Sequence, residues 1–231
     1  MKKGMIYSGV LAAMSLLLLT SCYPEKYEDI EDLDIVQTQY DDEFDFNSKS
    51  YFLLADTVPI ISEDSGYEKS PEEILMDNAI VGEVADQMTQ AGYTQLSQAD
   101  TADNEKMDDA LVLLVSRATE SYTEYYYDYY NYGYNYWDGF YGLDYYYPGY
   151  YWRNYYPWGY PVSFSYSVGT VIIEMLDPSA PYELNDGEEE VSFPVRWMAV
   201  LNGLAELSYE NTEDRILDGI NQAFEQSPYL Y

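Results

Sequence analysis

The first 22 residues constrain the fold most, because they have the composition of a segment that is exported or membrane-inserted rather than packed in a domain. Lys2 and Lys3 give a basic start, and residues 5–19 are almost wholly apolar. Ser21 then leads to Cys22, the one cysteine of the sequence. A basic start, a short apolar run and small residues at its exit are typical of a secretory signal peptide. A stable membrane span needs about 20 apolar residues, which is more than this run supplies.

The stretch Leu19-Thr20-Ser21-Cys22 resembles the lipobox of bacterial lipoproteins. In that family the cysteine thiol is acylated with chains such as palmitate and the peptide is cut before the cysteine. The resemblance implies a signal peptide over 1–21, cleavage between Ser21 and Cys22, and lipidation of Cys22. The following residue is Tyr23 rather than Asp, which favours the outer membrane, on its periplasmic face or at the cell surface. A plain signal peptide with an incidental cysteine, or an uncleaved anchor, are the alternatives.

The charge of the chain limits its partners and its chemistry. The sequence has 42 acidic and 10 basic residues, a net charge of −32, and loss of Lys2 and Lys3 makes it −34. Nucleic acid is excluded as a partner because phosphates require a basic surface. Anionic head groups are repelled too, so we expect contact with the bilayer only through acylated Cys22. No histidine is present, which removes the commonest general base and metal ligand. We therefore expect no catalytic residue, no metal site and no cofactor.

Residues 22–34 are acidic and without periodicity, which predicts a tether between the anchor and a domain over 35–231. Within that domain, residues 122–160 hold 18 tyrosines and three tryptophans in no regular spacing. We interpret this segment as a low-complexity insertion, a long loop or extended hairpin between two strands. Tyrosine and tryptophan offer large rigid faces with a polar edge, which suit contacts with envelope proteins or glycans. The candidate binding residues are Tyr126, Tyr130, Tyr134, Trp137, Tyr146, Tyr151, Trp152 and Trp158. The alternative is a disordered or self-packed insertion without a partner.

Apolar and capping patterns predict an α+β domain. Strand character is found over 35–40, 51–55, 110–115, 170–177 and 195–201. Ser70 and Glu73 predict a capping box at the start of a helix that ends at Gly92. A second helix begins near Asn211 or Thr212 and ends at Ser227. We expect a mostly antiparallel sheet of about five strands with two helices packed on one face, interrupted by the tyrosine-rich insertion.

Several of these motifs, in this order, resemble a family of bacterial envelope lipoproteins, domain of unknown function 4136. They are the Phe44-Asp45-Phe46 turn, the Lys49-Ser50-Tyr51-Phe52 strand start, the Gly92-Tyr93 helix end and the Arg196-Trp197 pair of the last strand. In the family the arginine follows the tryptophan, so the last motif departs from the pattern. The resemblance covers residues 35–229 outside the insertion and implies no known activity.

We therefore expect a membrane-anchored, non-enzymatic lipoprotein of the cell envelope, a binding or scaffolding module with an aromatic contact segment. The alternative is an envelope hydrolase acting on glycans through a pair of carboxylates. Carboxylate pairs such as Asp41-Asp42 and Asp108-Asp109 occur by chance in so acidic a chain, so the sequence favours solvated surface.

Overall fold

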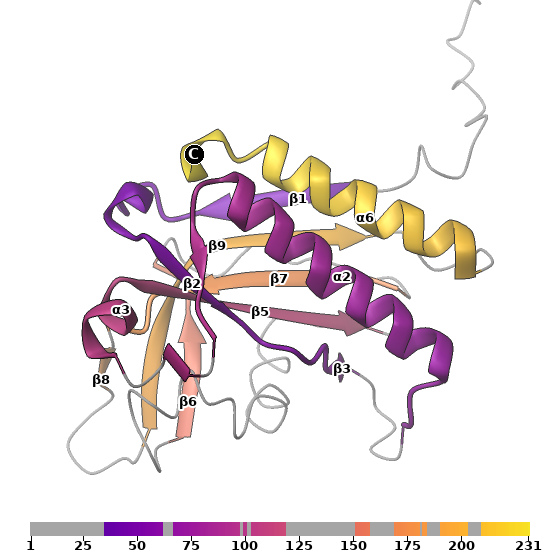
Figure 1. Cartoon of the computed structure of the whole chain (residues 1–231), viewed down its shortest axis with the longest axis horizontal. Helices are drawn as coiled ribbons and strands as arrows, with labels where there is room; N and C mark the ends of the chain where they lie inside the picture. The colour runs from indigo at the N-terminus through magenta and orange to yellow at the C-terminus, as the bar shows by residue number, and fades with distance from the viewer. Residues whose placement is uncertain are drawn as a thin grey trace, which may run out of the picture. The chain divides into compact units, whose positions relative to one another are not determined.

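A mixed β-sheet forms the centre of the described chain (Figure 1). The computed structural model describes residues 35–61, 67–97, 99–100, 103–118, 151–157, 169–180, 182–183, 190–202 and 209–231. The chain divides into the units Met1–Leu33 and Asp34–Tyr231, and every element below belongs to the second. The strands are β1 (Ile35–Tyr40), β2 (Tyr51–Leu54), β3 (Ile60–Ile61), β4 (Thr94–Gln95), β5 (Ala110–Ala118), β6 (Tyr151–Tyr155), β7 (Val171–Leu176), β8 (Tyr182–Glu183) and β9 (Glu190–Asn202). The helices are α2 (Pro71–Gln90), α3 (Asn104–Asp108) and α6 (Tyr209–Glu225), with 3-10 turns η2 (Phe46–Ser48) and η4 (Pro228–Leu230).

The two halves of the sheet differ in strand direction. The order along it is β1-β9-β7-β5-β2-β4, and the pairs among the first four strands are antiparallel. From β5 onward the pairs are parallel, between β5 and β2, between β2 and β4, and also between β5 and β3. The expected fold, a mostly antiparallel sheet of about five strands with two helices, is therefore wrong. In the described residues the sheet is mixed, six strands form its main path, and α3 is a third α-helix.

The parallel half follows from a crossover connection. The 20-residue helix α2 carries the chain from β3 back to β4, and a strand that returns through such a crossover runs in the original direction. The strand–helix–strand order is present in the sequence, but an apolar pattern reports which positions are buried and not which way a strand runs. This is why strand direction was predicted wrongly.

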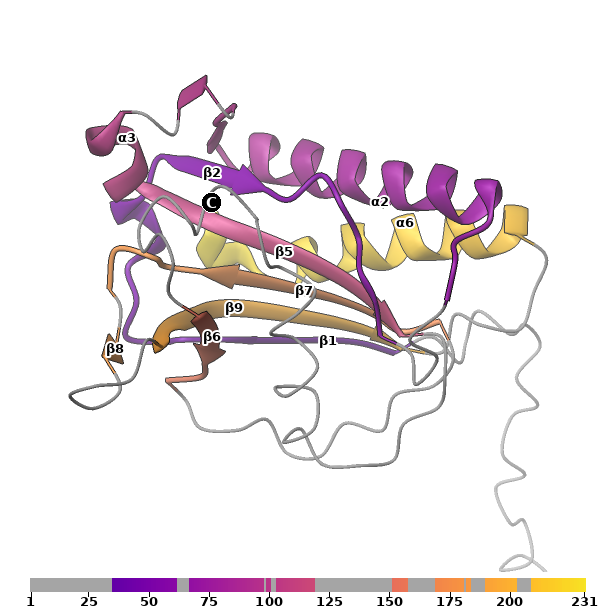
Figure 2. The same ribbon diagram turned by 90° about the horizontal axis from the view of Figure 1, so that it is seen from below.

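Strand β5 separates two buried clusters, one on each face of the sheet. Leu111 and Leu113 lie in the cluster beneath α2 and α6, whereas Val112 and Leu114 lie in the other. Figure 2 shows both long helices on one side of the sheet and β6 on the other. Burial on both faces explains why β5 is apolar at nearly every position.

Helix α2 begins and ends as its sequence predicts. The Ser70 hydroxyl oxygen accepts a hydrogen bond from the Glu73 amide (3.2 Å), and the Glu73 carboxylate accepts one from the Ser70 amide (2.9 Å). This reciprocal pair is the predicted capping box. At the other end Gly92 has a φ of +100°, and the Tyr93 amide donates to the Met88 carbonyl at 3.1 Å. Glycine favours this left-handed position, which completes a Schellman ending.

Strand β9 belongs to two groups of strands. Its first half pairs with β6 and β8, and its second half pairs with β7 and β1. Pro194 lies at the change, as the last residue paired with β6, and its carbonyl accepts from the Asp177 amide at 3.0 Å. Proline cannot donate to a strand ladder, so it is tolerated where pairing changes from one neighbour to another.

Helix α6 approaches the strands through a glycine. A Cβ atom on Gly219 would lie 2.8 Å from Leu201 Cδ2 and 3.6 Å from Val36 Cγ2, so a side chain there would require the Leu201 side chain or the helix to shift. The end of α6 is tied to β9 as well, because the indole of buried Trp197 donates to the Ser227 hydroxyl at 2.8 Å.

Candidate functional site

Most residues predicted to bind lie outside the described part of the chain. This applies to Ser21 and Cys22 and to the aromatic residues Tyr126, Tyr130, Tyr134, Trp137, Tyr146 and Trp158. Tyr151 and Trp152 lie in β6, where the backbone alone is described at these positions. The structure thus places two of the eight aromatic candidates, next to each other on one strand.

The C-terminal part of the tyrosine-rich segment is built into the sheet. Strand β6 runs parallel to the first half of β9, from the pair Tyr151–Glu190 to the pair Tyr155–Pro194. Tyr156 directly follows β6 with 7% of its surface exposed, and its hydroxyl donates to Glu174 on β7. Glu174 is 2% exposed, so this hydrogen bond lies within the core on the face opposite the helices. Residues 151–156 of the segment are therefore held by strand pairing and by this buried hydrogen bond.

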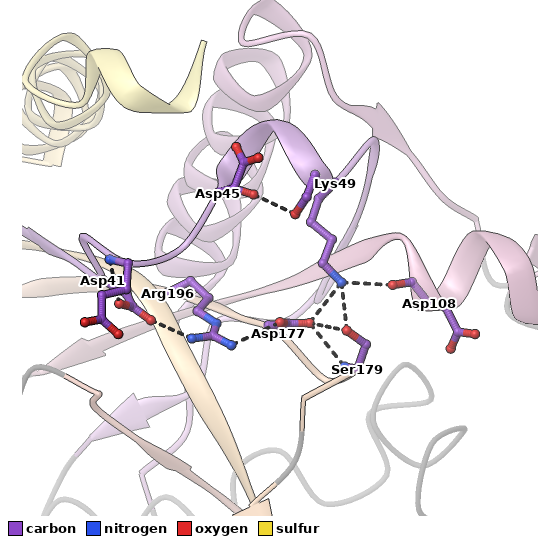
Figure 3. Close-up of polar contacts among 9 residues, drawn as sticks. Asp41, Asp45, Lys49, Asp108, Asp177, Ser179 and Arg196 are labelled. Carbon is purple, nitrogen blue, oxygen red and sulfur yellow. Dashed lines mark hydrogen bonds and ion pairs between the residues drawn. The ribbon is translucent and has the colours of Figure 1, made fainter.

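A cluster of ion pairs lies near the bend in β9, and Figure 3 shows it. We call it the Asp177 cluster; its members are Asp41, Lys49, Asp177, Ser179 and Arg196. Lys49 Nζ lies 3.0 Å from Asp177 Oδ1, and Arg196 Nη2 lies 3.3 Å from Asp177 Oδ2. Arg196 Nη1 also pairs with Asp41 Oδ2 at 2.5 Å. One carboxylate thus holds two cations from different parts of the chain.

Asp41, Lys49 and Asp177 each directly follow the end of an element, whereas Arg196 lies within β9. Asp41 directly follows β1, and its amide donates to the Arg196 carbonyl at 2.9 Å. Lys49 directly follows the η2 turn, whose N-terminus is capped by the Asp45 carboxylate, which accepts from the Asn47 amide. Asp177 directly follows β7, where the strand reaches the bend of β9. The arrangement therefore joins segments that are far apart in sequence.

The Lys49 ammonium group is fully paired, whereas Arg196 Nε is buried without a hydrogen-bond partner among the described residues. Lys49 Nζ donates to the Asp108 carbonyl (2.9 Å) and to Ser179 Oγ (2.8 Å) as well as to Asp177, which uses all three of its protons. Burial raises the pKa of Asp177, but the hydrogen bond from Ser179 and the charges of Lys49 and Arg196 outweigh it, so the pKa lies below its ordinary value. A carboxylic acid that stays ionised at neutral pH is a poor proton donor. The geometry is that of a structural ion-pair network.

A second buried group of charges, the Arg117 cluster, links β5 to α2. It consists of Tyr67, Lys69, Glu73, Asp77 and Arg117. Arg117 Nε donates to Asp77 Oδ1 at 2.7 Å, and its Nη2 lies 3.5 Å from Glu73 Oε1. Lys69 pairs with the other oxygen of Asp77, and the Tyr67 hydroxyl donates to Glu73 at 2.6 Å.

The charges of the Arg117 cluster also compensate one another. Burial raises the pKa of Glu73, and hydrogen bonds from Tyr67 and Ser70 together with the charge of Arg117 lower it further than burial raises it. The net effect is a pKa below the ordinary value, so Glu73 is ionised at neutral pH. This cluster fixes the first two turns of α2 to the sheet.

The described residues contain no group of three or more His, Cys, Asp or Glu side chains that could hold a metal ion. Among those same residues, no helix has the length and apolar character needed to cross a bilayer.

Lys49 and Arg196 are recognisable in the sequence as motif residues, but neither ion-pair cluster was predicted, although the two arginines carry a signal. Arg117 and Arg196 each stand within apolar strands, in Leu-Val-Ser-Arg-Ala and Pro-Val-Arg-Trp. In a chain with ten basic residues, an arginine inside a buried strand needs a carboxylate partner. The pattern identifies the arginines but not which of 42 acidic residues they meet.

Comparison with known proteins identifies the family. The family model described as Domain of unknown function (DUF4136) matches residues 36–229. A crystal structure of a DUF4136 family protein from Bacteroides thetaiotaomicron VPI-5482 is 28% identical, with a TM-score of 0.56, and the match covers 85% of this chain and 97% of that one. The PelC dodecamer from Paraburkholderia phytofirmans matches at 11% identity and a TM-score of 0.34, over 85% of this chain and 96% of that one. None of the curated proteins compared with the chain matches it. The resemblance expected from the sequence is confirmed, and the chain belongs to the DUF4136 family.

Proposed function

We propose that this protein is a membrane-anchored, non-enzymatic lipoprotein of the cell envelope that acts as a binding or scaffolding module. The observation that carries the proposal is the leader that ends in Cys22, the one cysteine of the chain. Each buried methylene of an acyl chain contributes about 0.8 kcal/mol, and two chains hold a protein stably where one does not. We place the protein at the outer membrane, on the periplasmic face or at the cell surface.

The charge distribution supports anchoring by lipid rather than by the protein surface. Five of the described cations form ion pairs with carboxylates, namely Lys49, Lys69, Lys106, Arg117 and Arg196. The remaining carboxylates give the domain an anionic exterior. This exterior repels anionic head groups and nucleic acid. The bilayer contact therefore falls to acylated Cys22.

A non-enzymatic role is supported by what the described carboxylates do. Two acidic pairs could serve a hydrolase, Asp41-Asp42 and Asp108-Asp109. In the first pair Asp41 forms an ion pair with Arg196, and in the second pair the side chain of Asp108 is exposed. Two of the buried acids, Asp177 and Glu73, have lowered pKa values, whereas a general acid for glycoside hydrolysis needs a raised pKa.

The contact segment of the module is the tyrosine-rich stretch over 122–160. Its end is supported by β6 and by the hydrogen bond from Tyr156 to Glu174. A segment that starts from a fixed strand loses less entropy on binding than a free chain does. Its aromatic side chains suit envelope proteins or the flat faces of sugars.

The anchor is tested in the native host by mass spectrometry and membrane fractionation of the full chain and of Cys22→Ser. We expect a mature N-terminus at Cys22 carrying acyl chains, and loss of Cys22→Ser from the membrane fraction. An unmodified Cys22, or a membrane association that survives Cys22→Ser, would overturn the proposal.

The contact segment is tested by deleting residues 122–150, which leaves β6 and Tyr156 in place. We expect the deletion to lose binding to isolated cell-wall glycan or to envelope protein extracts while its unfolding midpoint stays unchanged. A matched control replaces the same residues by a Gly/Ser linker of equal length. Binding that persists in both variants would refute a role for the aromatic residues.

A further inference from the structure

The outer edge of β1 presents backbone groups that β9 does not use. β1 lies at one end of the strand order and pairs with β9 alone among the described strands. The Asp41 amide donates to the Arg196 carbonyl, and hydrogen-bonded pairs alternate along an antiparallel ladder. Gln39, Gln37 and Ile35 therefore direct their backbone groups toward β9. The amides and carbonyls of the alternate residues, Val36, Thr38 and Tyr40, point away from it.

In its own length and sequence, β1 lacks the features by which proteins often protect an edge strand. Exposed edges are commonly short, or carry proline, lysine or a bulge. β4, at the opposite end of the order, has two residues, whereas β1 has six, of sequence Ile-Val-Gln-Thr-Gln-Tyr. β1 contains no proline, glycine or charged residue, although 23% of the chain is charged. The six registered pairs with β9 contain no shift.

The side chains of β1 hold the edge in place before any partner binds. Val36 packs against the core beneath α6, and Tyr40 stacks on Tyr229 with ring centroids 3.7 Å apart. Thr38 contributes a side-chain hydrogen bond to Tyr229. A preformed edge binds an added strand without the cost of ordering its own backbone.

The surroundings of β1 select the charge of a partner. Exposed Asp42 and Glu43 follow the strand, and Asp34 precedes it in sequence. A second copy aligned antiparallel would bring like charges together at both ends of the added strand, and like charges at an interface are unfavourable. Lysine or arginine at the ends of an incoming segment would be favoured at the same places.

We propose that the outer edge of β1 binds an extended segment of another protein that carries basic residues at both ends. The segment adds as a strand, and the backbone groups of Val36, Thr38 and Tyr40 hold it. The inference names a partner class for the proposed binding module and rests on that proposed function. It does not depend on the lipid anchor or on the tyrosine-rich segment.

The test uses the full chain in detergent and two labelled peptides, Lys-Lys-Thr-Val-Thr-Val-Thr-Val-Lys-Lys and the same peptide with glutamates at its ends. Fluorescence polarisation should detect binding of the lysine-ended peptide and at least about tenfold weaker binding of the other, a difference that salt reduces. Residue-resolved amide exchange should slow at Val36, Thr38 and Tyr40 when the lysine-ended peptide is bound.

Thr38→Pro removes one outward amide, and proline is tolerated on strand edges. We expect it to weaken binding of the lysine-ended peptide at least about tenfold, whereas Thr38→Ser, which keeps both the hydroxyl and the amide, binds normally. If Thr38→Pro does not fold, the amide-exchange experiment on the natural sequence tests the proposal instead.

Unchanged exchange at all three amides overturns the proposal, as does equal binding of both peptides. A dimer in sedimentation that Thr38→Pro abolishes would assign the edge to a second copy instead. Failure of Cys22 lipidation would refute the anchor alone.

Discussion

The Arg117 and Asp177 clusters use buried charge in opposite ways. In the Arg117 cluster one arginine on β5 meets two carboxylates from successive turns of α2. In the Asp177 cluster one carboxylate meets two cations, and Arg196 and its second partner Asp41 are 155 positions apart in sequence. The first fixes one helix to one strand, whereas the second joins the ends of β1, η2 and β7 to β9. In a chain with 42 acidic and 10 basic residues the cations are scarce, so the positions of the cations determine which distant segments are held together.

The largest effect is expected from Asp177→Asn, because it leaves Lys49 and Arg196 without their shared carboxylate in a buried site. We expect the free energy of unfolding to fall by about 3–5 kcal/mol, the usual cost of removing one partner of a buried ion pair. Urea denaturation at pH 7 measures it. The control is Asp108→Asn, because Lys49 binds the backbone carbonyl there and the side chain is exposed. Equal stability of the two variants would refute a central role for Asp177.

A smaller loss is expected from Arg117→Met, about 2 kcal/mol, because Lys69 still pairs with Asp77 after the change. The stability of Arg117→Lys should lie between that of the natural protein and that of Arg117→Met. Lysine keeps the charge but cannot reproduce the fork of donors that meets both carboxylates. Unfolding in urea, followed by circular dichroism, gives both values. A loss larger than that of Asp177→Asn would reverse the ranking of the two clusters.

The dependence of stability on pH separates the contribution of Asp177 from the rest. Its folded pKa is lowered, so its contribution to stability is present above the unfolded pKa of about 4 and is lost as pH falls through the folded value. Between pH 6 and pH 2.5 the natural protein should therefore lose more stability than Asp177→Asn does. Glu73→Gln should reduce the same acid-induced loss, because the pKa of Glu73 is lowered too. Parallel stability curves for the natural protein and Asp177→Asn would contradict this account.

The smallest effect is expected from Ser70→Ala, which removes one half of the capping box of α2. A lost cap of this kind costs about 1 kcal/mol. The matched control is Thr89→Ala on the same helix, whose exposed hydroxyl donates to the carbonyl of Ala85 and should contribute less than about 0.5 kcal/mol. Combining Ser70→Ala with Arg117→Met should give less than the sum of both losses, because Glu73 belongs to the cap and to the cluster. If the two losses of stability were strictly additive, the capping box and the Arg117 cluster would be energetically independent, which would contradict this prediction.

Features that depend on neighbouring residues could be predicted from the sequence. The start of α2 at Ser70, its end at Gly92 and the apolar strand β5 follow from local capping and burial patterns. The parallel pairing of β2 with β5 could not be predicted in this way, because it depends on the path of α2 across the sheet. β6 could not be predicted either, because it lies in a low-complexity segment and its five residues do not alternate between apolar and polar side chains.

The candidate site shows the same limit. Asp41 and Arg196 were visible as single residues, but their pairing across 155 positions depends on the register of β1 against β9. The lipobox at Cys22 and the binding role of all eight aromatic candidates stay predictions, and this includes Tyr151 and Trp152, which the structure places on β6.

The double membership of β9 gives the domain a continuous mechanical path. Ile35, where the described chain begins, lies beside Asn202 at one end of β9, and Tyr151 of β6 lies beside Glu190 at the other end. A force applied between Ile35 and β6 would therefore be transmitted along a single strand. Six registered residue pairs between β1 and β9 would carry that force together, because pulling at Ile35 loads the ladder in shear and does not open it one pair at a time.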